Sequence, residues 1–167
     1  MNAVPYEVMQ ALQVLVYRSC TTMNEERWSE YLALCDPQAF RYQVLTYSPE
    51  IRREQCWADR DFRAMKSAFD LLPRHNSDRS RLTRHVVVQH ADYDAATRRA
   101  RVETQLTIYR TQIDGTMSYI ESGQTTLYAI GRYEDEIGLD EDGTARLLAR
   151  TVRLETRQLD IGSHKPF

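Results

Sequence analysis

The segment from Arg99 to Tyr109, RARVETQLTIY, alternates between two kinds of side chain and constrains the fold more than any other stretch. One row consists of Val102, Thr104, Leu106 and Ile108, and the other of Glu103, Gln105, Thr107 and Tyr109. A period of two predicts a β-strand with one buried face and one face exposed to water or to a partner. At about 3.3 Å per residue the strand would span about 36 Å, which is long for a globular protein. We therefore expect a curved antiparallel sheet, or a strand shared with another subunit.

Length and charge restrict the class of protein. A chain of 167 residues is expected to form one domain, 1–167, with a single core. The net charge of −2, from 22 basic and 24 acidic residues, argues against a surface for nucleic acid or for an anionic membrane. No apolar run approaches the ~20 residues of a membrane helix, and the N-terminal MNAVPYEVMQ lacks the features of a secretory signal.

The three cysteines, Cys20, Cys35 and Cys56, are odd in number and show no CxxC spacing. This pattern favours free, buried thiols in a reducing compartment. We therefore expect a cytoplasmic protein that binds neither nucleic acid nor membrane.

Three helices are predicted in the first half of the chain, at residues 5–20, 24–36 and 54–72. Pro5 suits a first helical position, Asn24 is a good N-cap, and Pro73 is expected to end the third helix. Spacings of three and four residues place the apolar side chains of each helix on one face. These side chains are Val8, Met9, Leu12, Leu15 and Val16, then Trp28, Tyr31, Leu32 and Cys35, then Phe62, Met65, Phe69 and Leu72.

The strands are predicted at residues 40–47, 82–89, 99–109, 124–133 and 145–160, with an extension at 116–120 after a turn at Asp114-Gly115. Loops are predicted at the polar segments 74–81 and 138–143, and a turn is predicted at Ser122-Gly123. Helices gathered on one face of a bent antiparallel sheet make an α+β fold. A cone-shaped half-barrel of this kind resembles the cystatin and nuclear transport factor group, and it would enclose a pocket.

The four histidines, His75, His85, His90 and His164, include no pair with the i, i+4 spacing of helical metal ligands. His85 and His90 are five residues apart on a predicted strand, which would place them on opposite faces. No Cys-X-His pair is present to ligate a Rieske cluster. The nucleotide-binding, metalloprotease and serine-hydrolase motifs are also missing from the sequence. We expect no metal or cofactor in this chain.

Charged and aromatic residues gather near the predicted strand ends. The acidic run Glu134-Asp135-Glu136 would be a metal site, a solvated strand end or a salt-bridging edge. Arg81 and Arg84, together with Arg79, could supply the opposite charge across a subunit interface, within the chain, or toward a phosphate. The ten tyrosines fit either sheet packing or an oligomer interface.

Several of these segments, taken together, resemble the small (β) subunit of Rieske-type ring-hydroxylating dioxygenases from about residue 8 to Phe167. The segments are Trp28-x-x-Tyr31 with Leu34 and Asp36, Tyr42-Gln43-Val44, Ser80-Arg81-Leu82-Thr83-Arg84-His85, and Gly131-Arg132-Tyr133-Glu134-Asp135-Glu136. The resemblance implies a cone-shaped subunit that forms a homotrimer and supports three large catalytic α subunits (α3β3). It also implies that the Rieske [2Fe–2S] cluster and the mononuclear iron belong to the α subunit. The role of this chain would then be structural, in an oxygenase for an aromatic compound or for a small alkanesulfonate.

Two sets of candidate residues follow. For subunit contacts the candidates are Arg81, Arg84, Tyr133, Glu134, Asp135 and Phe167. The alternative function is a free-standing isomerase, dehydratase or cyclase of the same fold, which needs an acid or base in the pocket. Its candidates are His85, Asp59, Tyr42 and Tyr128. A small-ligand binding module without chemistry is a third hypothesis.

Overall fold

The computed structural model describes residues 4–76, 78–113, 122–159 and 164–167, and these contain three helices and six strands. In chain order they are α1 (Tyr6–Asn24), α2 (Trp28–Ala33), β1 (Arg41–Ser48), β2 (Arg53–Asp61), α3 (Phe62–His75), β3 (Arg81–Asp94), β4 (Arg99–Thr111), β5 (Thr125–Leu139) and β6 (Ala145–Leu154). The strands form one sheet in the order β2-β1-β6-β5-β4-β3. The predicted α+β class is confirmed.

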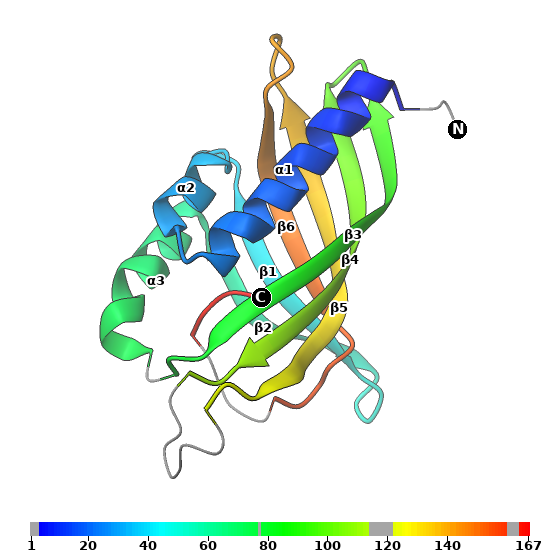
Figure 1. The fold of residues 1–167 in the computed structure, drawn as a ribbon. Coiled ribbons are helices and arrows are strands. Elements are labelled where there is room, and N and C mark those ends of the chain that lie inside the picture. Colours follow the sequence, from blue (N-terminus) through cyan, green and yellow to red (C-terminus); the bar gives the residue numbers. More distant parts are fainter. Residues whose placement is uncertain (1–3, 77, 114–121, 160–163) are drawn as a thin grey trace.

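The sheet curves around α1, which lies across its inner face, while α2 and α3 lie beside β1 and β2 (Figure 1). Neighbouring strands are antiparallel with one exception, because β1 pairs with β6 in parallel. The sequence analysis did not predict this parallel pair, which joins the earliest strand to the latest. Among the described helices, none is long and apolar enough to cross a membrane.

The alternating segment forms β4 as predicted. Val102, Leu106 and Ile108 face inward and are at most 2% exposed, whereas Glu103 and Gln105 face outward. The inner row packs under α1, whose buried face includes Leu12, Leu15, Val16, Cys20 and Met23. Burial of these side chains, each worth about 1.5–3 kcal/mol when large and apolar, holds the helix in the hollow of the sheet.

The predicted helix at 54–72 is wrong in its first half, where the chain forms β2. This strand lies at the edge of the sheet, and most of its side chains are exposed, so it lacks the alternation that marks a half-buried strand. The helix α3 begins only at Phe62, after Asp61 accepts a hydrogen bond from the backbone N–H of Ala64 at 2.7 Å. Pro73 lies inside the last turn rather than after it, and the helix continues to His75.

Asn24 is the last residue of α1 and not the cap of the second helix, which begins at Trp28. Its side-chain oxygen instead accepts a hydrogen bond from the backbone N–H of Arg84 at 2.9 Å. His85 and His90 lie on the same outer face of β3, because a β-bulge between Val88 and His90 inserts an extra residue. The predicted opposite placement is therefore wrong.

The second half of the sheet differs from the prediction mainly in length. β5 continues to Leu139, so the acidic run lies within a strand and not after one, and β6 ends at Leu154. The turn at Ser122-Gly123 is present, with Gly123 at a φ of +86° that favours glycine. The predicted turn at Asp114-Gly115 and the extension at 116–120 lie outside the described residues.

Candidate functional site

The hollow of the sheet contains a buried ion pair. Asp135 on β5 and Arg150 on β6 are register partners, and their side chains are fully buried. The guanidinium donates two hydrogen bonds to the carboxylate, Nε to Oδ1 at 2.8 Å and Nη2 to Oδ2 at 2.7 Å. It also lies over the ring of Tyr133, 4.1 Å from its centroid. This bidentate geometry with an aromatic neighbour suits arginine in particular.

The groups around the pair keep a fixed protonation state near neutral pH. Burial on its own would lower the pKa of Arg150, but the charge and hydrogen bonds of Asp135 outweigh it and raise the pKa well above its usual value. Burial likewise raises the pKa values of the Tyr31 and Tyr133 hydroxyls. An acid–base catalyst needs a pKa near the working pH, so this centre suits structure rather than proton transfer.

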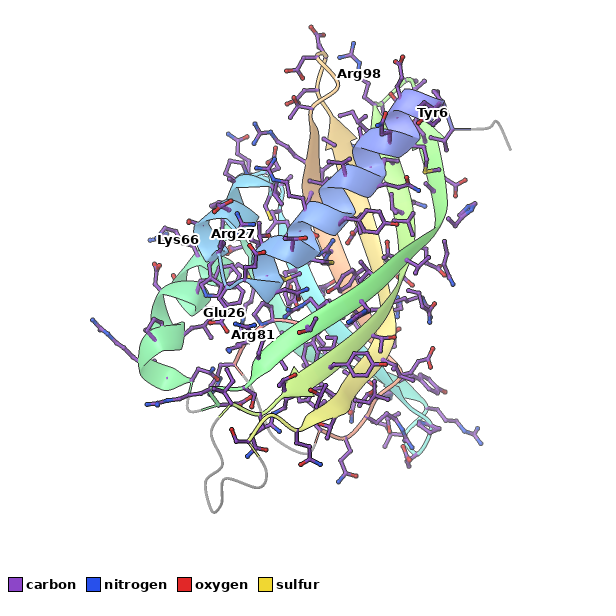
Figure 2. The ribbon with its side chains drawn as sticks, viewed as in Figure 1. Tyr6, Glu26, Arg27, Lys66, Arg81 and Arg98 are labelled. Atoms are coloured by element: carbon purple, nitrogen blue, oxygen red, sulfur yellow. The ribbon has the colours of Figure 1, made fainter. Side chains whose placement is uncertain are left out.

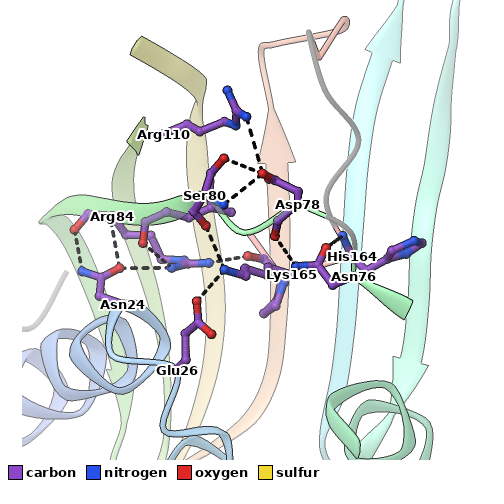
Figure 3. A network of polar contacts seen from close by, with 11 residues as sticks. Asn24, Glu26, Asn76, Asp78, Ser80, Arg84, Arg110, His164 and Lys165 are labelled. Carbon is purple, nitrogen blue, oxygen red and sulfur yellow. Dashed lines mark hydrogen bonds and ion pairs between the residues drawn. The ribbon is translucent and has the colours of Figure 1, made fainter. Parts of the chain in front are cut away.

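A second polar cluster holds residues 164–167 at the end of the sheet where β3 begins (Figure 3). The Arg84 guanidinium, 5% exposed, donates to Asn24 Oδ1 at 3.0 Å and to the carbonyl oxygen of Pro166. The Lys165 ammonium forms an ion pair with Glu26 at 2.5 Å and donates to the carbonyl oxygen of Ser80 at 2.8 Å. The cluster therefore joins the last residues of the chain to α1 and β3.

The loop before β3 extends this cluster. Asp78 accepts hydrogen bonds at Oδ1 from the Ser80 backbone N–H at 3.0 Å and from Arg110 at 3.4 Å. Burial would raise the pKa of the Asp78 carboxyl, but the hydrogen bonds from the Ser80 hydroxyl, the Ser80 backbone N–H and Arg110 outweigh it and lower the pKa. The segment was predicted to be a surface loop, yet Asp78 and Ser80 are buried. Asp78 Oδ1 and the backbone and hydroxyl groups of Ser80 find partners within the chain.

The six subunit-contact candidates fall into two groups. Arg84, Tyr133 and Asp135 are enclosed by the chain itself. Arg81, Glu134 and Phe167 remain exposed or partly exposed, and Arg81 lies at the surface near the end of α1 (Figure 2).

Glu134 belongs to a row of alternating charges on the outer face of the sheet. It accepts from Arg153 Nε at 2.7 Å and from Arg132 Nε at 3.0 Å. Arg153 also pairs with Glu54 on β2, and Arg132 lies 4.0 Å from Glu103. We name these five residues the outer charge row. The hypothesis of a salt-bridging strand edge is thus realised within one chain, across several strands.

The four acid–base candidates do not converge on one site, although Tyr42 and Tyr128 both contact Phe167. His85 lies on the outer face of β3, with its ring 5.4 Å from that of Tyr109. Asp59 lies on β2, where hydrogen bonds from Arg41 lower its pKa. The hydroxyl of Tyr42 contacts the backbone of Phe167, and the ring of Tyr128 stacks on the Phe167 ring.

No group of three or more metal-ligating side chains occurs among the residues that the structure describes. All four histidines are exposed, namely His75, His85, His90 and His164. The His90 ring contacts the carboxylate of Asp92 at 3.1 Å.

Three important residues were not found from the sequence. Arg150 lies in the segment ARLLARTVRL, where several arginines look alike, and only its register with Asp135 distinguishes it. Lys165 carries no local signal, because its partners are 85 and 139 residues away. Trp57 falls in the strand that was mistaken for a helix.

No family model matches the chain. The curated relatives and the solved structures that match it include subunits of oxygenases. The β subunit of the methanesulfonate monooxygenase hydroxylase from Methylosulfonomonas methylovora is 32% identical over 161 residues, which is 96% of this chain and 88% of the relative. The β subunit of 2-aminobenzenesulfonate 2,3-dioxygenase from an Alcaligenes species is 29% identical, over 91% of this chain and 94% of the relative.

A solved structure of naphthalene 1,2-dioxygenase with bound indole contains a chain of the same fold. The TM-score is 0.75 at 18% identity, with 99% of this chain and 86% of that chain covered. A solved protein from Nostoc punctiforme with a cystatin-like fold also matches, with a TM-score of 0.58 at 14% identity over 91% of this chain and 93% of that chain, which supports the predicted cone. The sequence identity to the first relative extends over nearly the whole length of this chain. The chain therefore belongs to the family of small (β) subunits of Rieske-type ring-hydroxylating oxygenases.

Proposed function

We propose that this chain is the non-catalytic small subunit of a multicomponent Rieske non-haem iron oxygenase. The observation that carries the proposal is the 32% identity to a monooxygenase β subunit along 96% of the chain. The interior supports it, because the hollow of the sheet holds the hydrogen-bonded Asp135–Arg150 pair, and burial raises the pKa values of the Tyr31 and Tyr133 hydroxyls beside it.

The proposed assembly is a homotrimer that supports three large α subunits. Strands of 13 to 15 residues in β3, β4 and β5 extend well beyond the helices that cover their inner face (Figure 1). The exposed Arg81 and the partly exposed Glu134 and Phe167 are the candidates that remain for direct contact with another subunit. Arg84, Tyr133 and Asp135 would act on the interface indirectly, by fixing the shape of the subunit.

The Rieske [2Fe–2S] cluster and the mononuclear iron are proposed to belong to the α subunit. For the substrate we propose a sulfonate, since both curated relatives carry a sulfonate in their names, one aliphatic and one aromatic. Each name describes the relative and not this chain.

The test is to purify the chain alone and together with the proposed large (α) subunit. We expect the chain alone to sediment as three copies of 19.6 kDa and to show no turnover. With the partner we expect a brown α3β3 complex that oxidises a sulfonate. Turnover by the isolated chain, with a bell-shaped pH profile, would instead support the isomerase or dehydratase alternative.

Substitution of Arg81 tests the interface directly. Arg81→Ala should leave the melting temperature of the dissociated chain unchanged but weaken assembly by about 2–5 kcal/mol if the guanidinium pairs across subunits. Arg84→Ala is the matched comparison, and it should lower folding stability because its partners lie within the chain. An unchanged sedimentation profile for Arg81→Ala would exclude that residue from the contact.

A further inference from the structure

Residues 164–167, His-Lys-Pro-Phe, are held by contacts with parts of the chain 82 to 139 residues away. These contacts come from β1, β2, β3 and β5, from the loop between α1 and α2, and from the segment between α3 and β3. They divide into three neighbouring subsites, one for each of the last three residues. The first of the four residues adds one bond, from its backbone N–H to Asn76 Oδ1 at 3.3 Å.

The first subsite holds a cation. The Lys165 side chain is buried, with its ammonium 2.5 Å from Glu26 Oε1 and 2.8 Å from the Ser80 carbonyl oxygen. Burying an ammonium costs several kcal/mol unless acceptors replace its water shell. The carboxylate and the carbonyl supply those acceptors, so this subsite selects for a basic side chain.

The second subsite binds a backbone carbonyl. Arg84 donates from Nη2 to the Pro166 oxygen, and Asn24 holds the guanidinium from its other side. The donor is therefore already in position before the segment arrives, which lowers the cost of binding. Proline suits this position because it lacks an N–H that would need a partner and because its φ is fixed.

The third subsite is a slot for an aromatic ring. The Phe167 ring stacks on Tyr128 with an interplanar angle of 15°, and Trp57 lies 6.4 Å away from its centroid. The Phe167 backbone N–H donates to the Tyr42 hydroxyl at 3.0 Å. Trp57 is the extra residue of a β-bulge, because Val44 pairs with Ala58 and the next residue pairs with Cys56. Bulges of this kind redirect a side chain.

We propose that this end of the sheet is a peptide-binding site for a short segment with the order basic residue, proline, aromatic residue, and that residues 164–167 are its built-in ligand. The three subsites consist of groups that lie far from the tail in sequence. A groove of about 570 Å³, lined in part by Glu26, Trp28 and Lys165, opens beside the cation subsite and gives a segment from outside a route to it.

A tethered ligand has an effective concentration on the order of millimolar. The intact chain will therefore exclude an added peptide, and the site must be tested with a weakened tail. The variant Lys165→Ala/Phe167→Ala removes two of the tail's side chains and leaves all three subsites in place.

The probe is the acetylated tetrapeptide His-Lys-Pro-Phe, titrated into this variant. We expect saturable binding of one peptide per chain with a Kd below ~1 mM. The readouts are calorimetry, the fluorescence of the two tryptophans, Trp28 and Trp57, and a rise in melting temperature toward that of the unsubstituted chain. His-Ala-Pro-Phe and His-Lys-Pro-Ala should each bind at least about tenfold more weakly.

Two further substitutions in the same variant distinguish binding at this site from non-specific binding of the peptide. Arg84→Met should abolish binding, because it removes the donor to the proline carbonyl. Arg101→Met, an exposed arginine on the outer face of β4, should leave binding unchanged. Equal binding of the three peptides, or no binding by a variant whose circular dichroism remains native, would overturn the proposal.

If the double variant does not fold, the single variant Phe167→Ala provides the same test. Its Lys165 and Pro166 contacts remain, so higher peptide concentrations are needed, but the preference for Phe over Ala in the peptide should persist. Loss of that preference would equally contradict the site. The experiment needs only the isolated chain, so its outcome is independent of the proposed oxygenase assembly.

Discussion

The inner and outer faces of β5 and β6 carry the same chemistry in different surroundings. Inside, Asp135 and Arg150 are completely buried, and outside, Glu134 and Arg153 are roughly one third exposed. Both are carboxylate–guanidinium pairs on the same two strands, at adjacent positions of β5. The inner pair has no water to replace a lost partner, whereas the outer pair has water on one side. Because successive side chains of a strand point to opposite faces, these adjacent acidic residues should contribute very differently to the free energy of unfolding.

Removing one partner of the inner pair should have the largest effect. Asp135→Ala leaves the Arg150 guanidinium buried without its carboxylate, and it should lower the free energy of unfolding by about 3–5 kcal/mol. Urea denaturation followed by circular dichroism measures this change.

The control for this substitution replaces both partners. Asp135→Leu/Arg150→Met removes both charges and fills part of the space, so it should recover much of the lost stability. If the double variant is as unstable as Asp135→Ala, the uncompensated charge is not the cause.

Removing a charge from the outer charge row should cost less. Glu134→Gln keeps the size of the side chain, and solvent screens the remaining arginines, so we expect a loss of up to about 1 kcal/mol. The same urea titration applies, and a loss as large as that of Asp135→Ala would show that the two faces do not differ as described.

Acidification should reduce the difference in stability between the wild type and Glu134→Gln. Burial would raise the pKa of Glu134, but Arg153 and Arg132 outweigh it and hold the pKa below its ordinary value of 4.5. A carboxyl with a depressed pKa contributes stability above its unfolded pKa and loses it as the pH falls through the folded pKa. The stability difference between wild type and Glu134→Gln should therefore be constant near neutral pH and shrink below about pH 4.5. A difference that grows on acidification would contradict the assignment.

The smallest effect is expected at a mostly exposed pair on α3. Lys66 and Asp70 are 2.9 Å apart at i, i+4 spacing, and Lys66 projects away from the sheet (Figure 2). Lys66→Ala should change the free energy of unfolding by only about 0.3–0.5 kcal/mol. A thermal melt in low and high salt checks this value, because added salt should remove most of it.

Alternation and apolar spacing were sufficient to predict β4, α1 and the α+β class, because in these elements one face is buried and the other is not. They failed at β2, an edge strand exposed on both faces, where the pattern carries no information about burial. They also could not separate Arg150 and Arg84 from other arginines, since the role of each depends on a partner fixed by register or by a distant loop.

The parallel pairing of β1 with β6 has a consequence for the order of folding. In the described sheet, β1 and β2 join the other strands through β6, which is the latest of the six strands in the sequence. The early hairpin must therefore wait, with an unpaired edge, until β6 has been synthesised. We expect the sheet to close after translation and slowly, as is typical of folds dominated by distant contacts.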